Sequence, residues 1–298
     1  MAHKYFALAL LTGVILGTAV TVSRFAYLAD ASGIMVTLFR GLFMVVFLGI
    51  GLKITGHRWP LPKKLVPLAI VNGALMAIMT FGNIGAVEFI PIGLAALLFF
   101  TFPVMIALLV MVFRIEQVRP VKLLAVGIAF FGLSLVLGVS IDHVDWRGPV
   151  LSLSAAAACA VNAVLFARYF KNVNVFITTF HFSVYALLTL ALIALFMTYT
   201  PYGATRLPLT LSGWLGALGV GVLQGIGTPM YLYVILKIGA LKTGVVTNIQ
   251  PLVSIGQAWA IFGEVLSLFQ ALGGCLVLAA VAIMQWADLK EQSADDNA

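Results

Sequence analysis

The chain contains the same apolar segment twice, at a separation of half its length. Pro103 and Glu116 stand thirteen residues apart, as do Pro251 and Glu264, and the two pairs are 148 residues apart. Each pair closes a similar run, IGLAALLFFTFPVMIALLVMVFRIE and then IGALKTGVVTNIQPLVSIGQAWAIFGE, with one short length change before the second proline. In so apolar a chain, a repeat of this period predicts an internally duplicated membrane protein.

Composition defines the class of protein. Hydrophobic residues make up 62% of the 298 residues and charged residues only 9%, whereas soluble domains carry about 25% charged residues. Apolar stretches of membrane-spanning length recur along the whole chain, and no stretch between them is long enough for a soluble domain. We therefore predict an all-α integral membrane protein. Its ten transmembrane helices are expected at residues 5–24, 33–52, 66–89, 92–113, 121–140, 149–169, 176–198, 213–236, 240–262 and 267–287.

The ten helices divide into two repeats of five. We place the first repeat at residues 1–140, the second at 141–287, and a disordered cytoplasmic tail, DLKEQSADDNA, at 288–298. Because five crossings are an odd number, the second repeat enters the membrane from the opposite side, and the repeats are inverted. The first apolar run resembles a signal peptide, but it continues to Phe25 and has a counterpart in the second half, so we interpret it as helix one.

Lysines and arginines predict the orientation. With the N-terminus inside the cell, thirteen of the seventeen lie at cytoplasmic ends and loops, and only Arg24, Arg147 and Arg206 lie outside, with Arg40 inside a helix. The positive-inside rule then places both termini in the cytoplasm, in an inner membrane. The net charge of +7 reflects this topology, and we predict no nucleic-acid partner. Cys159 and Cys275 lie inside apolar runs and predict neither a disulfide nor a metal site.

Polar residues recur along the ninth predicted helix at steps of three and four. They form one stripe on an otherwise apolar helix, and Pro251 interrupts the helix at the middle of this stripe. Polar groups inside a membrane need partners or water. The stripe therefore either lines a cavity, the reading we favour, or forms hydrogen bonds between helices. Its members are Thr243, Thr247, Gln250, Ser254 and Gln257.

Other helices carry weaker versions of this pattern. Asn72 and Asn83 lie three turns apart along one side of helix three, and Gln224, Thr228 and Tyr231 share a face of helix eight. Together with the stripe, these residues predict a binding site at the midplane between helices three, four, eight and nine. Prolines that interrupt helices are candidates for gating. They are Pro103, Pro229 and Pro251.

Ionisable residues inside the predicted helices are candidate functional groups. Arg40 should pair with a carboxylate, for which Glu88 is the nearest candidate, or face water, or else extend toward the outer surface. Glu88, near the outer end of helix three, is either a proton-coupling site or a solvated carboxylate. His181 is either a substrate contact or a structural histidine. For Glu116 and Glu264 we favour structural roles.

The paired segments resemble the ten-helix, EamA-like branch of the drug/metabolite transporter superfamily. The markers are a proline, a helix-end glutamate and then glycine: Pro103, Glu116 and Gly127 in the first half, and Pro251, Glu264 and Gly273–Gly274 in the second. Arg24 and Arg40 match basic residues common in that family. One departure is Arg114, where the family usually has a small or apolar residue. The resemblance implies a central cavity formed by helices one to four and six to nine, with helices five and ten packed outside.

These observations predict a secondary transporter rather than an enzyme. The resemblance implies alternating-access movement of a small metabolite, such as an amino acid or a drug-like amphipathic compound. Export is the expected direction, and import or passive exchange is the alternative. An intramembrane enzyme is less favoured, because we find no phosphate-binding glycine loop and no HExxH or GxSxG motif. A channel, which would show ion flux without saturation or exchange, is also less favoured. We expect no cofactor, and membrane lipids and a small-molecule substrate as partners.

Overall fold

The protein is a bundle of helices. The computed structural model describes residues 2–56, 60–115, 118–138, 145–197, 207–263 and 267–295, and no strand occurs in these ranges. The elements are α1 (Ala2–Leu28), α2 (Gly33–Ile54), η1 (Lys63–Leu65), α3 (Val66–Gly85), η2 (Ala86–Glu88), α4 (Ile92–Phe99), α5 (Phe102–Val112), α6 (Pro120–Val136), α7 (Arg147–Tyr169), α8 (Val175–Met197), α9 (Leu211–Ile238), α10 (Ala240–Thr247), α11 (Gln250–Phe262) and α12 (Leu268–Asp295).

The predicted transmembrane helices all correspond to helical segments. Eight segments of the described chain are long and apolar enough to cross a membrane, counting α4 and α5 as one, and α6 is a shorter apolar helix. The remaining crossing is formed by α10 and α11 together. The prediction of an all-α membrane protein with two sets of five helices is therefore confirmed.

Two crossings are interrupted near their middles. α4 ends at Phe99 and α5 begins at Phe102, with Pro103 in its first turn; α10 ends at Thr247 and α11 begins at Gln250, with Pro251 in its first turn. Proline is tolerated in a first turn, because its missing N–H has no partner there. The two interruptions occupy equivalent places in the two repeats.

Pro229 does not break its helix. The sequence predicted a break there, but α9 runs without interruption from Leu211 to Ile238. In a membrane helix, neighbouring helices and local adjustments can compensate for the hydrogen bond that a proline removes. The residue four positions earlier, whose carbonyl the ring would crowd, is Gly225, and it packs tightly against the ring of Phe47.

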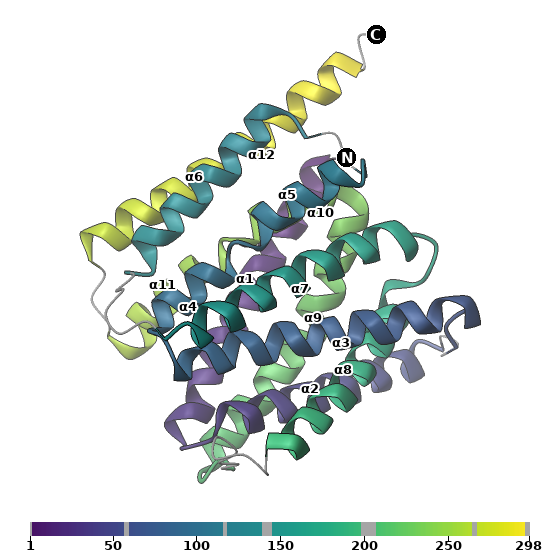
Figure 1. Cartoon of the computed structure of the whole chain (residues 1–298), viewed down its shortest axis with the longest axis vertical. Helices are drawn as coiled ribbons and strands as arrows, with labels where there is room; N and C mark the ends of the chain where they lie inside the picture. The colour runs from purple at the N-terminus through teal and green to yellow at the C-terminus, as the bar shows by residue number, and fades with distance from the viewer. Residues whose placement is uncertain are drawn as a thin grey trace.

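The two halves pack on each other in a symmetric pattern. α1 lies on α9 and α3 lies on α7, which are equivalent pairs in the two repeats; likewise α2 lies on α9 and α8 lies on α3. α6 packs on α12 and forms a separate layer along one side of the bundle (Figure 1). The core of the protein is thus shared between the repeats.

The ends of the chain lie at one end of the bundle. Figure 1 shows both termini there, as an even number of crossings requires. α12 continues to Asp295, so the backbone of residues 288–295 is helical where the sequence predicted a disordered tail. Leucine, lysine, glutamate and glutamine are good helix formers, and extending an existing helix avoids the cost of nucleation.

Glycines allow α6 and α12 to approach closely. A Cβ atom added to Gly132 would lie 2.8 Å from the carbonyl oxygen of Gly273, and a Cβ added to Gly273 would meet the carbonyl oxygen of Gly132. Small residues of this kind allow close van der Waals packing, which holds helices together in lipid, where no hydrophobic force acts between them.

We predict that Gly132→Leu destabilises the protein by about 1–3 kcal/mol, because the new side chain would push α12 away. Gly127→Leu, on the same helix, is the matched control, since a Cβ there meets nothing within 4 Å. Thermal unfolding in detergent measures the difference. Equal melting temperatures for the two variants would contradict the close packing of α6 on α12.

Candidate functional site

A large cavity lies between the two halves of the bundle. Its volume is about 880 Å³, and residues of α1, α2, α3, α4, α5, α7, α8, α9 and α11 line it. No described side chain of α6 or α12 lines it, as the family resemblance implied. The lining reaches Tyr27 near the end of α1 and Met197 at the end of α8. The cavity therefore extends from the interior to one end of the bundle.

The opposite end of the cavity is closed by aromatic packing. Phe166 and Phe170 stack with their ring centroids 6.0 Å apart, and the ring of Phe182 meets Phe170 edge-on at 5.1 Å. Phe182 also lines the cavity, so this cluster forms its floor. All three rings are almost completely buried.

Near the open end, an ion pair fixes the start of α7. The Arg147 guanidinium donates to the Asp145 carboxylate, with Nη2 and Oδ2 2.6 Å apart. The hydrogen bonds from this side chain, and a further one from the Arg147 backbone N–H, lower the pKa of Asp145 to about 2. The same guanidinium lies 4.3 Å from the ring centroid of Phe89, a cavity-lining residue. The pair thus connects α7 to the segment after η2.

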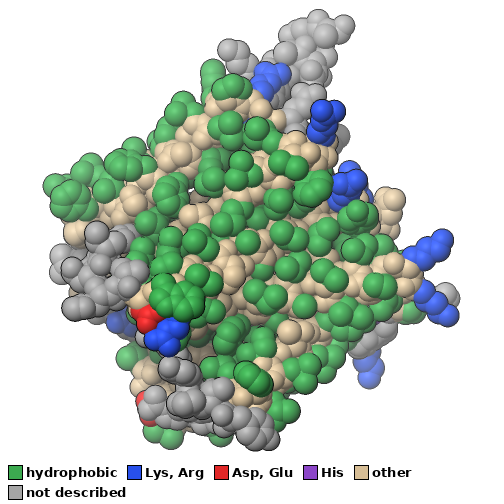
Figure 2. Space-filling view, viewed as in Figure 1, with side chains coloured by type: hydrophobic (Ala, Val, Ile, Leu, Met, Phe, Trp, Pro, Cys, Tyr) green, Lys and Arg blue, Asp and Glu red, His purple; other side chains and the backbone are tan. Residues whose placement is uncertain are grey.

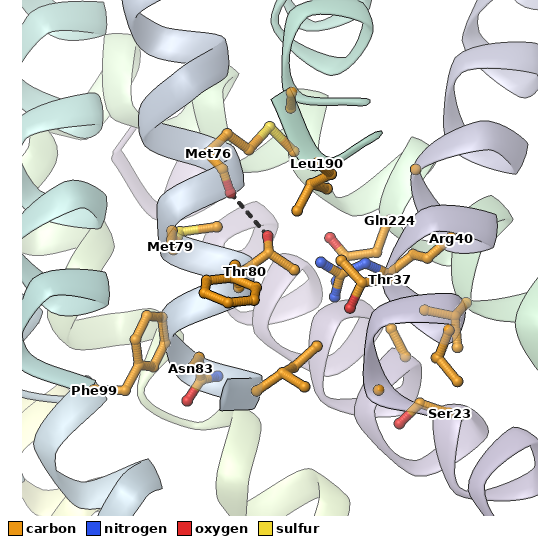
Figure 3. A pocket seen from close by; sticks show the side chains of 18 of the residues that line it. Ser23, Thr37, Arg40, Met76, Met79, Thr80, Asn83, Phe99, Leu190 and Gln224 are labelled. Carbon is orange, nitrogen blue, oxygen red and sulfur yellow. Dashed lines mark hydrogen bonds between the residues drawn. The ribbon is translucent and has the colours of Figure 1, made fainter. Parts of the chain in front are cut away.

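Arg40 is the only Lys, Arg, Asp or Glu among the described residues that line the cavity. Its helix is held close to α9 by Gly221, where an added Cβ would lie 3.1 Å from the Arg40 carbonyl oxygen. Figure 3 shows the guanidinium extending into the cavity, with Thr37 and Gln224 beside it. Within the part of the chain that the structure describes, it forms no hydrogen bond or ion pair. The cavity is therefore electropositive.

Gln224 and Tyr231 of α9, both predicted as site residues, line the cavity, and Thr228 of the same helix lines it with them. The Thr228 hydroxyl donates to the Gln224 side-chain carbonyl at 3.2 Å, which leaves the Gln224 amide nitrogen facing the cavity. The Tyr231 hydroxyl is buried and has no hydrogen-bond partner among the described residues. The shared face predicted for these three residues is thus directed at the cavity.

The polar stripe of the ninth crossing separates into different roles. Gln250 lines the cavity, and a Cβ at Gly17 of α1 would lie 2.7 Å from its carbonyl oxygen. The hydroxyls of Thr243, Thr247 and Ser254 bond to carbonyls of their own helical turns. Gln257 donates to Thr18 at 2.8 Å and so joins α11 to α1. Only Gln250 of the five is a cavity residue.

The two asparagines of α3 also differ. Asn83 lines the cavity (Figure 3), whereas Asn72 is fully buried outside it. The Asn72 amide donates to Leu68, and its backbone carbonyl accepts from the Asn162 side chain at 3.0 Å. Asn72 therefore joins α3 to α7, while Asn83 is available to a ligand.

His181 does not line the cavity. Its Nδ1 lies 2.9 Å from the Ile177 carbonyl oxygen, and its ring packs against Phe180 and Tyr185. Glu88 ends η2, but its side chain lies outside the described part of the structure, as do Glu116 and Glu264 entirely.

Several polar lining residues were missed by the sequence analysis. Most of them are single hydroxyls or amides on otherwise apolar helices, so no polar stripe marked them in the sequence. Thr80 could have been found from its spacing, because it lies one turn from both Met76 and Asn83 on the same face of α3. The missed residues are Ser23, Thr37, Thr80, Asn162, Thr179 and Ser183.

A membrane bundle of two similar halves, enclosing a cavity that reaches one end, is the architecture of a transporter. The sequence pattern of the EamA-like transporter family matches residues 3–138 and 146–286. The chain therefore belongs to the EamA-like transporter family, and it is a multi-pass integral membrane protein.

Known proteins agree with this assignment. An uncharacterized transporter of Archaeoglobus fulgidus is 26% identical over 222 residues, which cover 74% of this chain and 76% of that protein. A solved crystal structure superposes with a TM-score of 0.77 at 18% identity, covering 94% of this chain and 96% of that one. At this identity the crystal structure supports the fold alone.

We predict that Asn83→Cys reacts with a water-soluble maleimide, whereas Asn72→Cys does not, because only the first position faces the cavity. Both changes are made in a chain that also carries Cys159→Ala and Cys275→Ala, since Cys159 lines the cavity. Mass spectrometry of the folded protein in detergent measures the modification. Equal labelling at the two positions would contradict the assignment of Asn72 to the α3–α7 contact.

Proposed function

We propose that the chain is a secondary transporter that moves a small amphipathic metabolite by alternating access. The observation that carries this proposal is the central cavity, which reaches one end of the bundle and is closed at the other by Phe166, Phe170 and Phe182. Inverted repeats give such a carrier two related gates around one shared site. The interruptions before Pro103 and Pro251 stand at equivalent positions and are the candidate gating elements.

The charge distribution supports an orientation with both termini in the cytoplasm. Lysines and arginines gather along one edge of the molecule, at the end where the termini lie, and a broad apolar surface covers the rest of that face (Figure 2). The positive-inside rule assigns this edge to the cytoplasm. The cavity then reaches the outer side, and the phenylalanine floor faces inward. We propose an inner-membrane location on this basis, and export as the direction that the family resemblance implies.

We predict that cysteines placed at Trp146 and Leu209 react with an impermeant maleimide added outside intact cells, and that a cysteine at Lys63 reacts only after lysis. Trp146 and Leu209 are highly exposed and precede α7 and α9, whereas Lys63 begins the segment that enters α3. The reverse labelling pattern would invert the proposed orientation.

Proteoliposomes test the transport function. Uptake by a carrier saturates with substrate concentration, and its rate rises when substrate is also present on the opposite side of the membrane. Flux through a channel shows neither property. A panel of labelled amino acids, organic acids and drug-like amines should contain solutes that meet both criteria. A chain that conducts every panel member without saturation is not a carrier.

Proton coupling is proposed at Glu88, at the outer end of α3. We predict that Glu88→Gln abolishes uphill transport driven by a pH gradient and spares downhill exchange, because the amide cannot take up and release a proton. Asp30→Asn is the matched control, since Asp30 is an exposed carboxylate in the turn before α2. Uphill transport by Glu88→Gln at the unmodified rate would exclude this site.

A further inference from the structure

Arg40 has an unusual position for a charged side chain. It lies on the second turn of α2, inside a membrane-spanning segment, and directs its guanidinium into the cavity. An arginine at the centre of a membrane helix costs about 2.5–3.5 kcal/mol on insertion scales, and such residues are normally paired. No carboxylate among the described lining residues offers that pairing. The cavity thus holds a cation for which the described lining residues supply no counter-ion.

Two uncharged donors lie next to this cation. Thr37 is one turn before Arg40 on the same face of α2, and its hydroxyl is buried without a hydrogen-bond partner among the described residues. The amide nitrogen of Gln224 is available, because only its side-chain carbonyl is used, by Thr228. All three groups converge on one wall of the cavity (Figure 3). Arg40 and Gln224 together offer a fork of guanidinium N–H groups flanked by an amide, while the Thr37 hydroxyl beside them is buried.

The opposite wall is mostly apolar, with Thr80 and Asn83 as its polar members. Met76 and Met79 of α3 and Phe99 of α4 face this group across the cavity, with Leu190 at its side (Figure 3). A ligand that uses both walls must carry an anionic group at one end and an apolar body at the other. The volume of about 880 Å³ is in the range of small-molecule sites.

We propose that the cavity binds an organic monocarboxylate with an apolar body, held through its carboxylate by Arg40 and Gln224. A planar carboxylate accepts two parallel, charge-assisted hydrogen bonds from a guanidinium, and the resulting pair has no net charge. This inference rests on the proposed transport function and names the class of solute for the same site.

Charge matching distinguishes this class from two others. The ammonium group of a zwitterionic amino acid would find no carboxylate among the described lining residues. A phosphate monoester carries up to two negative charges at neutral pH, and Arg40 supplies one positive charge. A monocarboxylate without an ammonium group leaves neither charge unbalanced.

Equilibrium binding to the purified full-length protein in lipid nanodiscs tests the proposal. The probes share one ring: 3-phenylpropanoate, its neutral amide, phenylalanine and phenyl phosphate. We expect the carboxylate to bind at least about tenfold more tightly than each of the other three, in line with a charge-assisted bidentate contact. Equal affinity for the carboxylate and the amide, or tighter binding of phenylalanine, would overturn the proposal.

Variants locate the contact. Arg40→Gln should reduce 3-phenylpropanoate affinity at least about tenfold and leave amide affinity unchanged, and Arg40→Lys should give an intermediate loss, because it keeps the charge without the fork. Arg168→Gln is the matched control, since Arg168 is exposed at the end of α7, outside the cavity. Undiminished carboxylate binding by Arg40→Gln would refute the assignment.

Thermal unfolding separates a binding role from a structural one. Arg40→Gln should raise the melting temperature of the ligand-free protein, because it removes a buried charge that lacks a partner. A lowered melting temperature would show that Arg40 serves the fold. These binding results are independent of transport: proteoliposomes that carry amides or amino acids but ignore carboxylates would refute this inference and leave the carrier function standing.

Discussion

Inside a membrane every peptide N–H and C=O must find its hydrogen bond within the protein, and this requirement governs the whole chain. It forces the apolar segments into helices and confines irregular backbone to places that protein or a cavity covers. The two interrupted crossings obey this rule. Phe100 within the first break and Phe102 after it line the cavity, as does Gln250 after the second. Gly244 of α10 packs against Phe102 and Pro103 of α5, so the interrupted segments meet in the interior. Irregular backbone is thus placed where a ligand can reach it.

Close helix packing, and not hydrogen bonding, places the polar groups of the cavity. Lipid provides no hydrophobic force between helices, so small residues and van der Waals contact hold them together. Gly221 brings α9 onto the backbone of Arg40, and Gly17 brings α1 onto the backbone of Gln250. The side chains at these crossings are fixed by their helices and need no polar partner of their own. The Arg40 guanidinium accordingly remains available to a ligand, and the Thr37 and Tyr231 hydroxyls are buried without a partner among the described residues, at a cost in stability that functional sites commonly carry.

The fold was predictable because its signals are long and repeated. A membrane span needs about twenty apolar residues, so composition alone located the crossings, and the odd number of helices in each repeat implied the inversion. The site was less predictable because its distinctions are local. Asn72 and Asn83 lie on one side of the same helix, yet one binds a neighbouring helix and the other faces the cavity. Thr247 looked like a ligand contact, but its hydroxyl returns to its own backbone. Sequence periodicity identifies a helix face but not what covers it.

The two halves are similar in backbone and different in charge, and this difference has a functional consequence. Symmetry accounts for paired interruptions at Pro103 and Pro251, and in a carrier it accounts for gates on both sides of one site. Symmetry alone would also duplicate the ligand contacts. α8, the counterpart of α2, carries no lysine or arginine, so the cation of the cavity comes from one repeat only. A single positive charge can bind one end of a ligand while one gate closes and the other opens. The ligand then keeps the same contact in both states and need not move from a residue of one repeat to a residue of the other. In such a carrier the duplication provides the movement, and the divergence at Arg40 provides the selectivity.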